Sequence, residues 1–189
     1  PTIYKYVSES GDLAFIDEVI PYANKGEGTV YEHLKRAVDF SIKHLGPHGM
    51  PAGLYADWND CLRLGAEGES SFVAFQYYYA MTILGKFARY KKDESYIAFL
   101  DEKQKQLGKL IQKFCWNEDR FIRGFTEKGE VIGKRTDQEA NLWLNPQSWA
   151  VISGFATDEQ ADKALDTVHE RLNTEYGAVL MDPPYHFDA

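Results

Sequence analysis

The most reactive side chains of the sequence are concentrated in one short segment, Asp57-Trp58-Asn59-Asp60. It places two carboxylates within four residues, which is a composition suited to acid–base chemistry. The segment belongs to a stretch rich in glycine and polar residues, 47–68, that predicts a long loop. Loops on rigid elements often carry catalytic side chains. A second interpretation is that Asp57 and Asn59 make turns by binding nearby backbone amides.

Two predicted helices flank this loop. The first begins at a capping box, Thr29 to Glu32, and its apolar residues recur on one helix face; these are Val30, Leu34, Val38 and Ile42. The second begins at Ser70 or Ser71 and continues to Phe87, with apolar residues on almost every side. A helix that is apolar all round is typically buried, so we expect this helix in the core.

The remainder of the chain predicts further short elements. In order they are an amphipathic helix from Asp93 to Phe114, a hairpin over 121–132, a helix opened by Asn145-Pro146, and a helix from Thr157 to Leu172. Buried helices thus alternate with amphipathic ones, which favours an α/α toroid, with a plain helical bundle as the alternative. We predict an all-α fold with one short β-hairpin, as a single domain over 1–189.

Composition argues against several classes of protein. The net charge of −8 and the scattered Lys and Arg residues argue against nucleic-acid binding. No apolar run approaches ~18 residues, so no membrane-spanning helix is expected. No His, Cys or acidic cluster has metal-ligand spacing, and no glycine-rich loop resembles a nucleotide cradle. A disulfide between Cys61 and Cys115 is left open.

The ends of the sequence bear on its origin. It begins at Pro1 without an initiator Met and stops shortly after Pro183-Pro184-Tyr185. We therefore expect a segment of a larger protein, and we expect the isolated segment to be inactive. No signal peptide is visible, which favours a cytoplasmic location.

The stretch from Tyr55 to Leu64, together with residues that follow it, resembles the catalytic segment of the cellobiose phosphorylases. These belong to an inverting phosphorylase family that also includes cellodextrin and chitobiose enzymes. The resemblance is carried further by Gly65, Gly68-Glu69-Ser70, Ala74-Phe75-Gln76, Tyr6, Gly11-Asp12, Gly26-Glu27-Gly28-Thr29 and Asn145-Pro146-Gln147-Ser148-Trp149. It covers most of this chain, but this chain covers only part of the family's longer polypeptide. The resemblance implies that the chain forms part of an (α/α)6 barrel.

The resemblance also implies roles for individual residues. Asp60 would be the general acid, and Trp58 would lie against the transferred sugar. Asp57, Gln147 and Trp149 are further candidates for substrate binding, beside a turn role for Asp57 and core packing for Gln147 and Trp149. Inorganic phosphate is itself the nucleophile, so a second catalytic carboxylate is dispensable. Some phosphate contacts are expected outside these residues.

The expected activity is phosphorolysis of cellobiose with inversion, giving α-D-glucose 1-phosphate and D-glucose. The partners are then the disaccharide and inorganic phosphate as co-substrate, with no cofactor, metal, nucleic acid or membrane. A homodimer of the full-length protein is left open. One alternative is an inverting hydrolase, which would need a second carboxylate about 6.5–9.5 Å from the first. Another is a carbohydrate-binding segment without activity of its own.

Overall fold

The computed structural model describes residues 1–186, and within them the chain forms two compact units. The first comprises 1–43 with 80–104, and the second comprises 44–79 with the residues from 105 onward. The chain passes from one unit to the other at three points: after Lys43, and inside the continuous helices α3 (Ser71–Lys91) and α4 (Glu94–Phe114). The prediction of one domain over 1–189 remains a prediction.

The first unit is mainly helical. Its elements before α3 are α1 (Thr2–Ser10), the 3₁₀ helix η1 (Leu13–Asp17), the hairpin β1 (Val19–Pro21) and β2 (Glu27–Thr29), and α2 (Val30–Lys43). The predicted capping box is confirmed: the Thr29 amide donates to the Glu32 carboxylate at 2.7 Å, and the Glu32 amide donates to Thr29 Oγ1 at 3.1 Å. These bonds satisfy two backbone amides that a helix start otherwise leaves unpaired.

Helices α3 and α4 follow one another closely in sequence. As predicted, α3 is largely buried, with Phe72, Phe75 and Leu84 at most 4% exposed. Between the two helices Lys92 adopts a positive φ of 56°, and Asp93 Oδ1 accepts a hydrogen bond from the Tyr96 amide at 3.2 Å. Asp93 therefore caps α4, in agreement with the predicted helix start.

The second unit adds several small antiparallel sheets. The largest has the strand order β3 (Glu69–Ser70), β6 (Gly124–Phe125) and β7 (Val131–Ile132). Strands β6 and β7 confirm the hairpin predicted over 121–132, whereas β3 was not expected. The other ladders pair β4 (Trp116–Asn117) with β5 (Arg120–Phe121), β8 (Leu142–Trp143) with β11 (Met181–Asp182), and β9 (Asn173–Thr174) with β10 (Gly177–Ala178).

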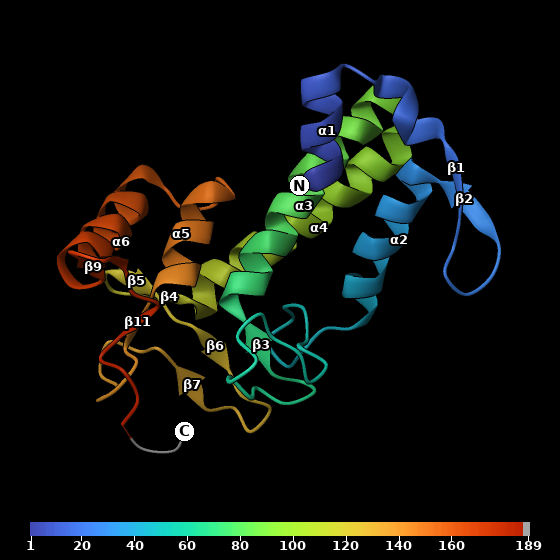
Figure 1. Ribbon diagram of the computed structural model, residues 1–189. Helices are drawn as coiled ribbons and strands as arrows, with labels where there is room; N and C mark the ends of the chain where they lie inside the picture. Colours follow the sequence, from blue (N-terminus) through green and yellow to red (C-terminus); the bar gives the residue numbers. More distant parts are fainter. Residues whose placement is uncertain (187–189) are drawn as a thin grey trace. The chain divides into compact units, whose positions relative to one another are not determined.

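Two helices complete this unit, and they lie side by side (Figure 1). The first, α5, spans Leu144–Ile152, so Asn145 is inside the helix, and the prediction that it caps the helix is wrong. The capping position belongs to Trp143, whose extended backbone comes from the end of β8. The second, α6, spans Asp158–Arg171 and has the complete capping box of Thr157 with Gln160.

The described part of the chain is mostly helical with several small sheets. An all-α chain with a single hairpin was therefore too simple a prediction. Strands of two or three residues are too short to leave an alternating pattern, which is why the sequence did not reveal them. No helix among residues 1–186 is long and apolar enough to cross a membrane.

Candidate active site

The loop that carries the candidate acid is closed at its base by backbone hydrogen bonds. The Gly53 amide donates to Gly68 O at 2.8 Å, and the Leu54 amide donates to Ala66 O at 2.9 Å. In the adjoining turn Leu54 and Tyr55 both have positive φ, 52° and 66°, and the Ala56 amide donates back to Gly53 O. This is the conformation of a type I′ turn built without glycine, which stores backbone strain.

Glu69 anchors the first part of the loop from within the core. Its side chain is 0% exposed, and its carboxylate accepts hydrogen bonds from the backbone amides of His48 and Met50, at 3.0 and 2.9 Å. It also pairs with Nδ1 of His48, whose ring stacks on Phe125 with 4.0 Å between centroids. A buried carboxylate needs several donors to offset lost hydration, and this one has them. Burial, followed by the Glu69 charge, raises the pKa of the neighbouring Cys115 thiol.

Asp57 is held by a buried cation. Its carboxylate is 2% exposed and forms an ion pair with the guanidinium of Arg123, which is 0% exposed. Asp57 Oδ1 also accepts a hydrogen bond from the Asn59 amide at 2.9 Å, which is the turn interaction considered from the sequence. Burial lowers the pKa of Arg123, and the charge of Asp57 opposes this shift. A guanidinium is protonated in proteins generally, so both members of the pair carry charge.

Asp60 lies only three residues further on, in a different environment. It is exposed, and no residue between 1 and 186 forms a hydrogen bond or ion pair with its carboxylate. Trp58 is 65% exposed and meets Phe72 edge to face, with centroids 6.3 Å apart. A carboxyl group and an indole ring are thus displayed to solvent on a loop whose base is fixed.

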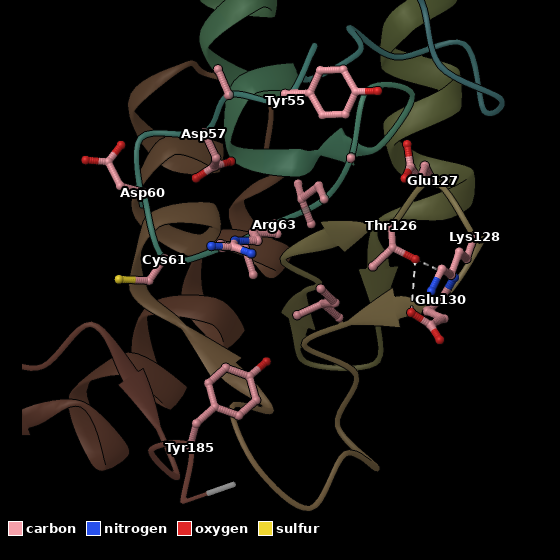
Figure 2. Close-up of a pocket in the computed structure, with 15 residues that line it drawn as sticks. Tyr55, Asp57, Asp60, Cys61, Arg63, Thr126, Glu127, Lys128, Glu130 and Tyr185 are labelled. Atoms are coloured by element: carbon pink, nitrogen blue, oxygen red, sulfur yellow. Dashed lines mark hydrogen bonds between the residues drawn. The ribbon is translucent and has the colours of Figure 1, made fainter. Parts of the chain in front are cut away.

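Asp57 and Asp60 both line a pocket of about 1170 Å³, although Trp58 does not. Its wall comes from the loop 55–65, from the hairpin residues 126–132, and from Tyr185. Figure 2 shows Asp60 and Cys61 on one side of the pocket and the hairpin residues on the other. The hairpin docks on the loop through Glu127, whose carboxylate accepts a hydrogen bond from the Ala66 amide at 2.9 Å. Burial, then Asp137 and Glu139, raises the pKa of Tyr185.

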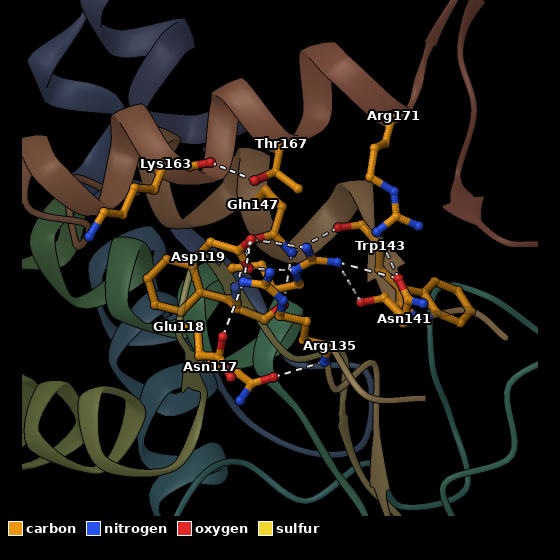
Figure 3. Close-up of polar contacts among 12 residues, drawn as sticks. Asn117, Glu118, Asp119, Arg135, Asn141, Trp143, Gln147, Lys163, Thr167 and Arg171 are labelled. Carbon is orange, nitrogen blue, oxygen red and sulfur yellow. Dashed lines mark hydrogen bonds and ion pairs between the residues drawn. The ribbon is translucent and has the colours of Figure 1, made fainter. Parts of the chain in front are cut away.

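Gln147 was expected as a candidate sugar contact, and the structure gives it another role. Its side chain is 0% exposed: Oε1 accepts from the Phe121 amide at 2.7 Å, while Nε2 donates to Phe121 O and Trp143 O (Figure 3). All three bonds go to backbone groups inside the core. Gln147 therefore extends the ladder of β5 onto α5, which is the packing role left open from the sequence.

Trp149 is half-buried and does not line the pocket. Its ring lies 5.9 Å from Phe72 and 6.3 Å from Tyr79, measured between centroids. Phe72 thus contacts both Trp58 and Trp149, so the two indoles named from the sequence belong to one aromatic cluster. Only Trp58 is extensively exposed within it.

The sequence interpretation missed Arg123. A usable signal was present, because Arg123 is the single charged residue in the run Phe121-Ile122-Arg123-Gly124-Phe125. Long charged side chains are rarely buried without a partner, so a cation within an apolar segment predicts an acidic partner in the core. The sequence does not say which acid it is.

The described residues hold no group of three or more His, Cys, Asp or Glu side chains arranged to bind a metal ion. Cys61 and Cys115 are both free thiols, one exposed and one buried, so they form no disulfide. The groups gathered at this loop include carboxylates, a buried guanidinium, aromatic rings and the exposed thiol of Cys61.

Comparison with known proteins gives a consistent result. Residues 1–188 match the family described as "Glycosyl hydrolase 94 superfamily, catalytic domain". An N,N'-diacetylchitobiose phosphorylase of Vibrio furnissii is 40% identical over 191 residues, covering 98% of this chain and 23% of that protein. A second such enzyme, of Vibrio proteolyticus, is 39% identical over 187 residues, with the same coverage of 98% and 23%.

A solabiose phosphorylase of Paenibacillus borealis is 35% identical over 189 residues, covering 98% of this chain and 25% of that protein. The chain thus spans about a quarter of the length of the curated relatives that it matches.

Proposed function

This chain belongs to the glycosyl hydrolase 94 superfamily, as part of its catalytic domain, and we propose that the protein containing it is an inverting disaccharide phosphorylase. The proposal is carried by Asp60, an exposed carboxyl group without a partner among the described residues, on a loop fixed from below by Glu69 and Arg123. The similarity to chitobiose and solabiose phosphorylases supports the general reaction class.

In the proposed reaction Asp60 protonates the glycosidic oxygen while phosphate attacks the anomeric carbon from the opposite face. One C–O bond to the leaving sugar breaks, one C–O bond to phosphate forms, and the configuration inverts. Asp60 must be protonated for this step.

We further propose that these residues form part of an (α/α)6 barrel completed by chain outside the segment. The helices α1 to α6 dominate the described chain, and this supports the proposal together with membership of the family. The remaining contacts to phosphate and to the second sugar would come in part from that additional chain. Trp58 is the proposed contact to the transferred sugar, because its ring is accessible and belongs to a residue two positions before the acid in the same loop.

The identity of the disaccharide is a finer proposal. The sequence resemblance indicated cellobiose, whereas the relatives reported above are named for diacetylchitobiose and solabiose. We propose a β-linked disaccharide as the substrate class and cellobiose as one member to be tested against the other two.

The test uses the full-length protein with each disaccharide in the presence and absence of inorganic phosphate. Proton NMR then follows the sugar 1-phosphate. We expect turnover only with phosphate, and only the α-anomer of the sugar phosphate as first product. Equal turnover in phosphate-free buffer, with free monosaccharides as the products, would instead identify a hydrolase.

A further inference from the structure

We propose that Arg123 is a positioning residue for the proton donor, and that its buried ion pair with Asp57 holds the turn that presents Asp60. This inference rests on the function proposed above. It assigns Asp57 to the support of the acid rather than to direct contact with sugar. Arg123, from the segment between β5 and β6, supports the acid together with Asp57.

The first step is that Arg123 is itself immobilised. Its amide donates to Ile132 O at 2.8 Å, and its carbonyl accepts from the Ser71 amide at 3.1 Å. Its guanidinium Nη1 donates to Ser70 Oγ at 2.6 Å, and the same oxygen accepts from the Val73 amide at the start of α3. The backbone of Arg123 is therefore bonded to the hairpin, and its guanidinium is bonded to Ser70, the residue that precedes α3.

The second step is that consecutive hydrogen-bonded turns connect Arg123 to the backbone of Asp60. Asp57 Oδ1 accepts from Arg123 Nη2 and also from the Asn59 amide. Asn59 Oδ1 in turn accepts from the Cys61 amide at 3.1 Å. The two turns share Asn59, and the backbone of Asp60 lies inside the second of them. Since its own carboxyl has no partner among the described residues, its position depends on that backbone.

The third step concerns what such a pair contributes. A buried ion pair often stabilises a fold no better than apolar residues of similar size, because both charges lose their hydration. Within residues 1–186, two of its buried atoms, Asp57 Oδ2 and Arg123 Nε, have no hydrogen-bond partner. An ion pair with unbonded buried atoms contributes little to stability. It does fix one loop geometry, since a planar guanidinium can bind a carboxylate in only a few orientations.

The test separates positioning of the acid from general support of the fold. Full-length Arg123→Gln and Asp57→Asn variants are assayed with a disaccharide and with the matching β-glycosyl fluoride, both with phosphate. Fluoride leaves without a proton, so its turnover does not need a general acid. We expect kcat on the disaccharide to fall on the order of 10²-fold, with KM little changed, while turnover of the fluoride is retained. Asp60→Asn serves as the reference and should give the same pattern.

Two further variants keep the test decisive. Arg123→Lys retains the positive charge but not the planar guanidinium with its paired N–H donors, so its loss of kcat on the disaccharide should be intermediate. The double variant, Asp57→Asn with Arg123→Gln, leaves no unpaired buried charge, so it remains testable if a single variant fails to fold. Because both changes remove one interaction, its loss should not exceed that of the worse single variant.

Arg120→Gln is the matched control. Arg120 is also buried, at 4% exposed, but it bonds Asp119 and Asn141 instead of the acid loop. It should alter stability without changing the ratio of disaccharide to fluoride turnover. The proposal is overturned if Arg123 and Asp57 variants lose both substrates in equal proportion, or if they keep the wild-type rate. Failure of the wild-type protein to phosphorolyse either substrate would instead refute the proposed function.

Discussion

Residues 48–52 and residues 58–63 belong to the same loop but are held in different ways. In the first stretch, the anchored segment, Met50 is 0% exposed and the buried Glu69 carboxylate binds its backbone amide. In the second, the exposed segment, Trp58 is 65% exposed and Asp60 has no partner within the described chain. Asp57 lies between them and is tied to Arg123.

The contrast separates stability from chemistry within one loop. Side chains that are already bonded inside the protein cannot bind or protonate a substrate without losing those bonds. Side chains that are exposed are available, but they add little to the free energy of unfolding. Substitutions in the anchored segment should therefore change the free energy of unfolding, and substitutions in the exposed segment should change kcat.

The largest expected effect is in the exposed segment. Replacing Asp60 by Asn in the full-length protein should lower kcat on the disaccharide on the order of 10²–10⁴-fold, because the proton donor is lost. The unfolding midpoint in urea should stay nearly unchanged, since the Asp60 side chain makes no bond in the described structure. Asp162→Asn, at another exposed acid, on α6, is the control and should change neither quantity. Nearly full activity in Asp60→Asn would refute its assignment as the acid.

The next effect is in the anchored segment. Glu69→Gln should lower the free energy of unfolding by about 2–3 kcal/mol, because charge-assisted bonds from the His48 and Met50 amides are weakened inside the core. Below the melting range its kcat should fall far less than that of Asp60→Asn. Urea denaturation followed by tryptophan fluorescence measures the first quantity. Glu67→Gln, on an exposed side chain two residues earlier, is the control. An unchanged midpoint for Glu69→Gln would remove the distinction between the two segments.

The smallest effect tests how the hairpin supports the loop. Gly65 and Gly129 have similar positive φ values of 88° and 82°, but they differ in surroundings. A Cβ at Gly65 would lie 2.2 Å from Glu127 Cδ, whereas nothing lies within 4 Å at Gly129. Gly129→Ala should therefore cost about 1 kcal/mol from backbone strain alone. Gly65→Ala should cost about 1 kcal/mol more, since Glu127 must move and give up its bond to the Ala66 amide.

Thermal or urea unfolding of both alanine variants measures this difference. When each glycine variant is combined with Glu127→Ala, Gly65→Ala and Gly129→Ala should destabilise the protein by similar amounts. Equal destabilisation by the two single glycine variants would show that the hairpin does not press on the loop at Gly65.

Much of the helical structure was accessible from the sequence. The caps at Thr29, Asp93 and Thr157 predicted helix starts that the structure contains. Each cap acts between residues three positions apart, so local sequence is enough. The predicted start of α5 was wrong by two residues because Trp143 at the end of β8, and not Asn145, occupies the capping position. Two-residue strands such as β3 escaped prediction because they form only where a distant strand is available.

The sequence by itself determined that two carboxylates, an indole and an amide would share one loop between two helices, and it matched that loop to a family. By residue type and spacing Asp57 and Asp60 were equivalent as acids, and the family resemblance alone assigned the acid to Asp60; Gln147 was as suited to a sugar as to a core. The tertiary structure added the physical difference between the two acids, since Arg123, 66 positions from Asp57, pairs with one acid and leaves the other exposed. Gln147 is likewise bonded to Phe121, 26 positions away. Burial and charge pairing depend on which distant segments fold against each other, and nothing in the local pattern specifies that partner.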